Sequence, residues 1–137
     1  MIKIPIYNER LKVIFYNENK DIESKYDIEI YPSTEAFTTR LNNGVILVAF
    51  NSNKVNSRVI VHECVHIVNF IFKSKGIGLH LDNDEAQAYL TDYIFELIHK
   101  KYFENEIRKA YNAGAKWGSD ETSEKYYKER FMGKLPI

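Results

Sequence analysis

The first half of the chain alternates short apolar runs with turn-forming residues, and this pattern predicts β-strands. β-Branched and aromatic residues at 11–16 (LKVIFY) predict one strand, and alternation at 27–31 (DIEIY) predicts another that stops at Pro32. The segments 35–41 and 45–51 flank Asn-Asn-Gly, which predicts a β-hairpin. Because the second of these segments is nearly all apolar, we expect both of its faces to be covered.

The second half of the chain has the apolar spacing of helices. Apolar residues occupy every face of 57–73, which predicts a buried helix with Asn56 or Ser57 as its N-cap and a stop at Gly76. A second helix is predicted to begin at residue 83 or 84 and to run past residue 97. Its expected apolar stripe consists of Ala86, Leu90, Tyr93 and Leu97.

The remaining segments complete the predicted organisation. Residues 103–117 continue the second helix or form a third, and 113–137 are expected to be a peripheral arm, either docked or partly disordered. Strands followed by helices predict one α+β domain over 1–137. In this fold a small antiparallel or mixed sheet packs on the buried helix and on a second long helix.

The composition of the chain limits which partners and which cellular compartment we expect. Nineteen basic and nineteen acidic residues give no net charge, so we expect neither nucleic acid nor a membrane as a partner. The single cysteine, Cys64, excludes an intramolecular disulfide and is compatible with a reducing compartment. No segment has the pattern of a signal peptide or the ~20 apolar residues of a membrane span. These features predict a soluble, cytoplasmic protein.

The predicted buried helix contains the sequence VIVHECVHIV at 59–68. His62 and His66 are four residues apart, so on a helix both imidazoles lie on one face and can share a Zn²⁺ ion at ~2.0–2.1 Å. Glu63 is offset by about 100° around the helix. It is therefore placed to reach a metal-bound water as a general base and not to ligate the ion. The alternative is a pair of core histidines with hydrogen-bonded nitrogens and an ion-paired or capping glutamate.

A catalytic zinc site normally has a third protein ligand. Glu85 follows His66 by nineteen residues and is predicted in the first turn of the second helix, where helix packing could bring it to the metal. As an alternative, Asp82 as an N-cap would form a capping box with Glu85. His80 is the second candidate for the third ligand.

The segments HECVH and NDEAQAYL together resemble the zincin metallopeptidases, specifically the gluzincin branch with glutamate as third ligand. They also resemble small zincin-like proteins of bacteria and phages, including regulatory proteases that cleave repressors. The resemblance covers about residues 35–98. It implies a minimal zincin-like fold in which an edge strand, here 44–51, aligns the substrate backbone. Many gluzincins have an acidic residue four positions after the third ligand; Tyr89 occupies that position here, and Asp92 is the candidate replacement.

These residues predict a zinc-dependent metallopeptidase that acts on a protein or peptide substrate. In this interpretation His62, His66 and Glu85 hold Zn²⁺, and Glu63 is the general base. Tyr89 and His80 are the candidates for stabilising the oxyanion. Asn69 is either a hydrogen-bonding neighbour of the ligands or an ordinary helix residue, and Cys64 is expected to be a small core residue. The alternative function is a non-catalytic zinc-binding protein with a structural, regulatory or phage assembly role, which would be virion-associated if the chain is phage-encoded.

Overall fold

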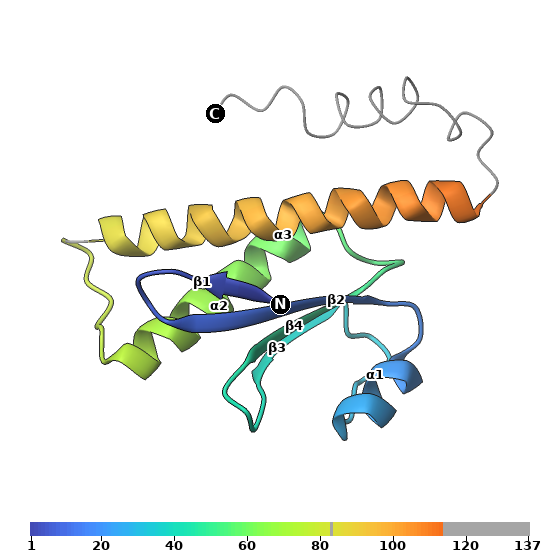
Figure 1. Cartoon of the computed structure of the whole chain (residues 1–137), viewed down its shortest axis with the longest axis horizontal. Helices are drawn as coiled ribbons and strands as arrows, with labels where there is room; N and C mark the ends of the chain where they lie inside the picture. The colour runs from blue at the N-terminus through green and yellow to red at the C-terminus, as the bar shows by residue number, and fades with distance from the viewer. Residues whose placement is uncertain (83, 114–137) are drawn as a thin grey trace. The chain divides into compact units, whose positions relative to one another are not determined.

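The computed structural model describes residues 1–82 and 84–113. Within these residues the chain forms four strands and three helices, shown in chain order in Figure 1. The α+β class predicted from the sequence is confirmed. The elements are β1 (Ile2–Ile4), β2 (Glu9–Tyr16), α1 (Asn19–Tyr26), β3 (Ala36–Arg40), β4 (Ile46–Asn51), α2 (Ser57–Lys75) and α3 (Glu85–Asn112).

The four strands form one mixed sheet in the order β1-β2-β4-β3. β2 and β4 are parallel, whereas β1 pairs with β2 and β3 pairs with β4 in antiparallel register. Every residue of β4 is buried, which confirms that both faces of this apolar strand are covered. The expectation that 44–51 forms the edge strand is wrong, because β2 pairs along one side of β4 and leaves β3 at the edge.

Strand register determines which side chains face each layer of the fold. Thr38 pairs with Val48, and Val48 pairs with Val13, so these three side chains lie on the same face of the sheet. This face is covered by α2, since Thr38 reaches Glu63 of that helix. The opposite face carries a second apolar cluster, built with α1, that contains Ile14, Tyr16, Ile22, Ile30, Phe37 and Ala49.

The strand predicted at 27–31 is not formed. The chain instead makes α1, which ends at Asp27 in the left-handed conformation, and continues as an extended segment. Ile30 is buried in the α1 cluster, and its backbone N–H donates to Glu23 Oε2 at 3.2 Å. The alternating pattern at 27–31 therefore indicated the burial of Ile30 correctly. Its N–H donates to the side chain of Glu23 in α1, and not to the backbone of a neighbouring strand. The short strand β1 was not predicted either.

α2 begins and ends as its capping residues predict. The Asn56 side chain accepts a hydrogen bond from the Val59 N–H at 3.0 Å, which identifies Asn56 as the N-cap. Gly76 ends the helix with φ of 69°, a left-handed conformation that favours glycine. The face toward the sheet is fully buried at Ile60, Cys64, Ile67 and Ile71.

α3 is one helix to Asn112, so the segment from 103 continues the second predicted helix. Its buried residues include Leu90, as expected, and Ile94, whereas Tyr93 is 39% exposed. Contacts divide the chain into two compact units, 1–95 and 96–137, with their boundary inside α3. The single-domain expectation stays a prediction, and residues 114–137 of the expected arm lie outside the described residues. None of the described helices is long and apolar enough to cross a membrane.

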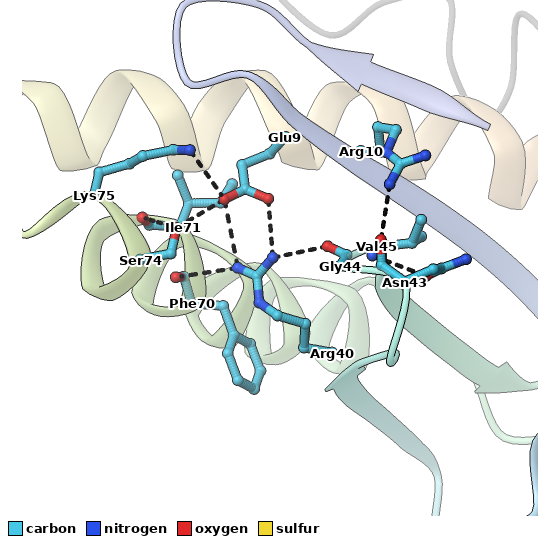
Figure 2. Close-up of polar contacts among 10 residues, drawn as sticks. All are labelled: Glu9, Arg10, Arg40, Asn43, Gly44, Val45, Phe70, Ile71, Ser74 and Lys75. Carbon is cyan, nitrogen blue, oxygen red and sulfur yellow. Dashed lines mark hydrogen bonds and ion pairs between the residues drawn. The ribbon is translucent and has the colours of Figure 1, made fainter.

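A polar cluster joins the end of β3 to the end of α2 (Figure 2). The buried Glu9 carboxylate accepts hydrogen bonds from Arg40 Nη1 at 3.0 Å and from Ser74 Oγ at 2.7 Å. Arg40 also donates to the carbonyls of Gly44 at 2.8 Å and Phe70 at 3.5 Å. Strands β2 and β3 are therefore both anchored to the C-terminal end of α2.

Candidate metal centre

The two histidines of the HECVH motif converge on one exposed face of α2. Their Nε2 atoms are 3.2 Å apart, and two nitrogens bound to one tetrahedral zinc ion at ~2.0–2.1 Å lie about 3.3 Å apart. The donor set and its spacing thus fit a shared divalent ion. The alternative placed both histidines in the core, which is wrong because His62 and His66 are exposed, although their Nε2 atoms are also within hydrogen-bond distance of each other.

Helix geometry accounts for this arrangement. Residues four apart lie one above the other, so His62 and His66 project from adjacent turns. The helix cannot rotate to bury them, because Ile60 and Ile67 on the other side of α2 are fully buried. A metal-ligating atom of Glu63 lies within 4.8 Å of one from each histidine, which makes these three residues a possible metal-binding group.

Glu63 differs from the histidines in its surroundings. It is only 3% exposed and points toward β3, where Thr38 Oγ1 donates to Glu63 Oε1 at 3.3 Å. Burial raises the pKa of the Glu63 carboxyl, and the His66 and His62 charges and the Thr38 hydrogen bond offset only part of this rise. A buried carboxylate with a raised pKa beside a possible metal-binding pair is the type of group that can accept a proton from water, so Glu63 is a candidate general base.

A small hollow of about 160 Å³ opens beside this carboxylate, between α2 and the chain that enters β3. Its two charged side chains other than Glu63 form an ion pair, with Arg58 Nη2 3.2 Å from Glu35 Oε2. The hollow lies next to both a candidate ligand and the candidate base, so a group bound in it would be adjacent to the metal centre. The lining residues are Ser33, Glu35, Ala36, Arg58, Val59, His62 and Glu63.

The other predicted site residues lie outside the possible metal-binding group. Glu85 is the first residue of α3 and its side chain is exposed. Exposed His80 lies close to Gly78 in its own loop, and Tyr89 is 70% exposed. Their assignments as third ligand and oxyanion stabilisers stay predictions. The capping box of Asp82 and Glu85 is wrong. Because α3 begins at Glu85, its N-cap position falls at residue 84 and not at Asp82.

A second hollow, of about 400 Å³, lies between α2 and the first turns of α3. Asp92 lines it together with Cys64 and does not join the possible metal-binding group. Burial, reinforced by the Glu63 charge, raises the pKa of the Cys64 thiol to about 12, so it is neutral near pH 7 and agrees with a core role. Asn69 Oδ1 is buried and has no hydrogen-bond partner among the described residues.

Sequence reasoning did not identify Thr38, Arg58 or Glu35 as parts of the site. The sequence near Thr38 gives no sign of its role. Alternate side chains of β3 point to opposite faces of the sheet, and only the pairing of β3 with β4 shows that Thr38 is on the face covered by α2. Arg58 has a local signal: it precedes His62 by four residues and so lies on the same face of α2. Glu35 has no such signal, since it meets Arg58 only in the folded chain.

Comparison with known proteins finds no matching family model, no similar curated protein and no similar solved structure. The candidate centre comprises a possible metal-binding group in α2, of which the Glu63 carboxylate is buried, and a hollow at the neighbouring sheet edge.

Proposed function

We propose that this chain is a zinc-dependent metallopeptidase. The observation that carries the proposal is the placement of three side chains: two exposed imidazoles with Nε2 atoms 3.2 Å apart, and Glu63 buried beside them. Structural zinc sites are closed by four protein ligands, whereas catalytic sites keep an open position. The exposure of His62 and His66 favours the catalytic type over the non-catalytic alternative.

In the proposed enzyme His62 and His66 hold Zn²⁺, with Glu85 as the proposed third ligand. A bound zinc ion lowers the pKa of a coordinated water to about 7 and polarises a carbonyl group. Glu63 accepts a proton from the attacking water and returns it to the leaving amine. Tyr89 and His80 remain the proposed stabilisers of the oxyanion.

The edge strand suggests how a substrate would bind. β3 has one side paired with β4, and the backbone groups of its other side face no further strand of the described sheet. An extended peptide can add to such an edge through main-chain hydrogen bonds. A peptide on this edge would run past Thr38 and hence past Glu63, with the hollow at Arg58 available to one of its side chains.

The proposal is tested by zinc analysis together with cleavage of an unfolded, reduced protein. Wild type is expected to hold about one zinc per chain and to cleave the substrate. Glu63→Gln should keep the zinc and lose cleavage, whereas His66→Ala should lose the zinc. Glu29→Gln removes an exposed carboxylate remote in sequence from the motif and serves as the matched control. Zinc binding by a wild type that cleaves nothing would instead support the non-catalytic alternative, and unchanged zinc in His66→Ala would refute the ligand assignment.

A further inference from the structure

Thr38 lies in the edge strand β3, and its hydroxyl contacts α2. It lies at the centre of β3, where pairing with Val48 turns its side chain toward α2. Its Oγ1 donates to Glu63 Oε1 at 3.3 Å. Among the described residues this is the one hydrogen bond found for the Glu63 carboxylate, and the Oε2 atom accepts none.

The neighbours of Thr38 on the same face of β3 cannot replace it. Ala36 has no polar side-chain atom. The Arg40 guanidinium is held by Glu9, at 3.0 Å, and by the Gly44 carbonyl, at 2.8 Å. Orientation of the Glu63 carboxylate by the sheet therefore depends on the Thr38 hydroxyl.

We propose that Thr38 is a positioning residue for Glu63. This inference rests on the proposed peptidase function. The hydroxyl holds Oε1, so that the carboxylate cannot rotate freely and Oε2 stays available for exchanging a proton with water.

Removal of this hydroxyl should lower the turnover rate more than it changes substrate affinity. Thr38 contacts Glu63 and is not among the residues that line the hollow, and it makes no contact with the imidazoles among the hydrogen bonds of the described residues, so KM and zinc content should stay close to their wild-type values. A displaced catalytic group costs up to about a hundredfold in rate. Because the 3.3 Å contact is long for a hydroxyl donor, we expect kcat to fall about tenfold.

The test compares three variants of the full chain. Thr38→Val keeps the side-chain shape and removes the hydroxyl, whereas Thr38→Ser keeps the hydroxyl. Thr39→Val makes the same change at the adjacent residue of β3, which faces the opposite side of the sheet and is paired with Leu47. For each variant we would measure kcat, KM, zinc per chain and the thermal midpoint, and determine the crystal structure.

The expected result is a kcat about tenfold lower in Thr38→Val, recovered in Thr38→Ser and unchanged in Thr39→Val. KM and zinc content should stay within about twofold of wild type in all three variants. In the Thr38→Val crystal structure the Glu63 carboxylate should leave its wild-type position. Wild-type kcat in Thr38→Val, failure of Thr38→Ser to recover, or an unmoved carboxylate would overturn the inference. If wild type cleaves nothing, the proposed function fails, and the carboxylate position still decides the role of Thr38.

Discussion

Replacement of Arg40 by methionine should destabilise the fold by leaving the Glu9 carboxylate buried without its main partner. The Glu9 side chain is only 6% exposed, and Arg40 approaches both of its oxygens, at 3.0 and 3.5 Å. Methionine keeps much of the packing of the arginine stem but offers no donor. The variant therefore removes the contacts that Figure 2 shows for the Arg40 guanidinium, with Glu9 and with the carbonyls of Gly44 and Phe70.

The magnitude follows from what remains around Glu9. Removing one partner of a buried ion pair costs about 3–5 kcal/mol. Here Ser74 Oγ at 2.7 Å and Lys75 Nζ at 3.5 Å still contact Glu9 Oε1, and the Arg40 side chain is 29% exposed. These remaining contacts and the partial hydration of Arg40 both reduce the loss. We therefore expect about 2–3 kcal/mol of destabilisation, at or below the lower end of the range for such pairs.

The assay is urea unfolding of wild type, Arg40→Met, Glu9→Gln and the double variant. The double variant should be less destabilised than the sum of the single variants, because it leaves no unpaired charge. Arg58→Met is the matched control, since its ion pair with Glu35 is 70% and 43% exposed and should contribute less than about 1 kcal/mol. Equal destabilisation by Arg40→Met and Arg58→Met, or additive effects of Arg40→Met and Glu9→Gln, would refute the reasoning.

Two further predictions concern the same helix and sheet. Burial acts to raise the pKa of Glu9, but hydrogen bonds from Arg40 and Ser74 and the charges of Arg40 and Lys75 outweigh it and lower the pKa below 4.5. A lowered pKa means that Glu9 stabilises the fold above pH 4.5 and that this contribution is lost as the pH falls further. In urea unfolding, the free energy of unfolding of Glu9→Gln should therefore fall less than that of wild type over this acidic range. Parallel pH dependences of the two proteins would contradict the prediction. Asn56→Ala removes the N-cap of α2 and should lower the free energy of unfolding by about 1 kcal/mol in the same assay. An unchanged free energy of unfolding would contradict the assignment of Asn56 as a stabilising cap.

The parts of the fold that the sequence predicts are those determined by nearby residues. α2 has an apolar face, an asparagine N-cap and a glycine C-cap, and all three signals lie within its own segment. The hairpin of β3 and β4 is likewise local, because Gly44 with φ of 87° supports the tight turn between the strands. The histidine pair belongs to the same class, since helical spacing alone brings the two rings together.

The parts that the sequence does not predict depend on pairing between distant segments. Parallel pairing of β2 with β4 makes β4 central, and no residue near 44–51 indicates this. The alternation at 27–31 reports that Ile30 is buried but not that its partner is Glu23 of α1. In both places the apolar pattern indicated burial and left the neighbouring element undetermined.

The same distinction applies to the candidate site. β3 contacts α2 at two levels: Thr38 meets Glu63, and Arg40 reaches the Phe70 carbonyl near the end of the helix. The imidazole pair is thus positioned by α2, and the Glu63 carboxylate by α2 together with β3. The proposed third ligand begins a separate helix, beyond the loop after Gly76. Placement of the candidate base, Glu63, therefore depends on β3. Completion of the proposed metal site by Glu85 would depend on where the first turn of α3 brings that side chain.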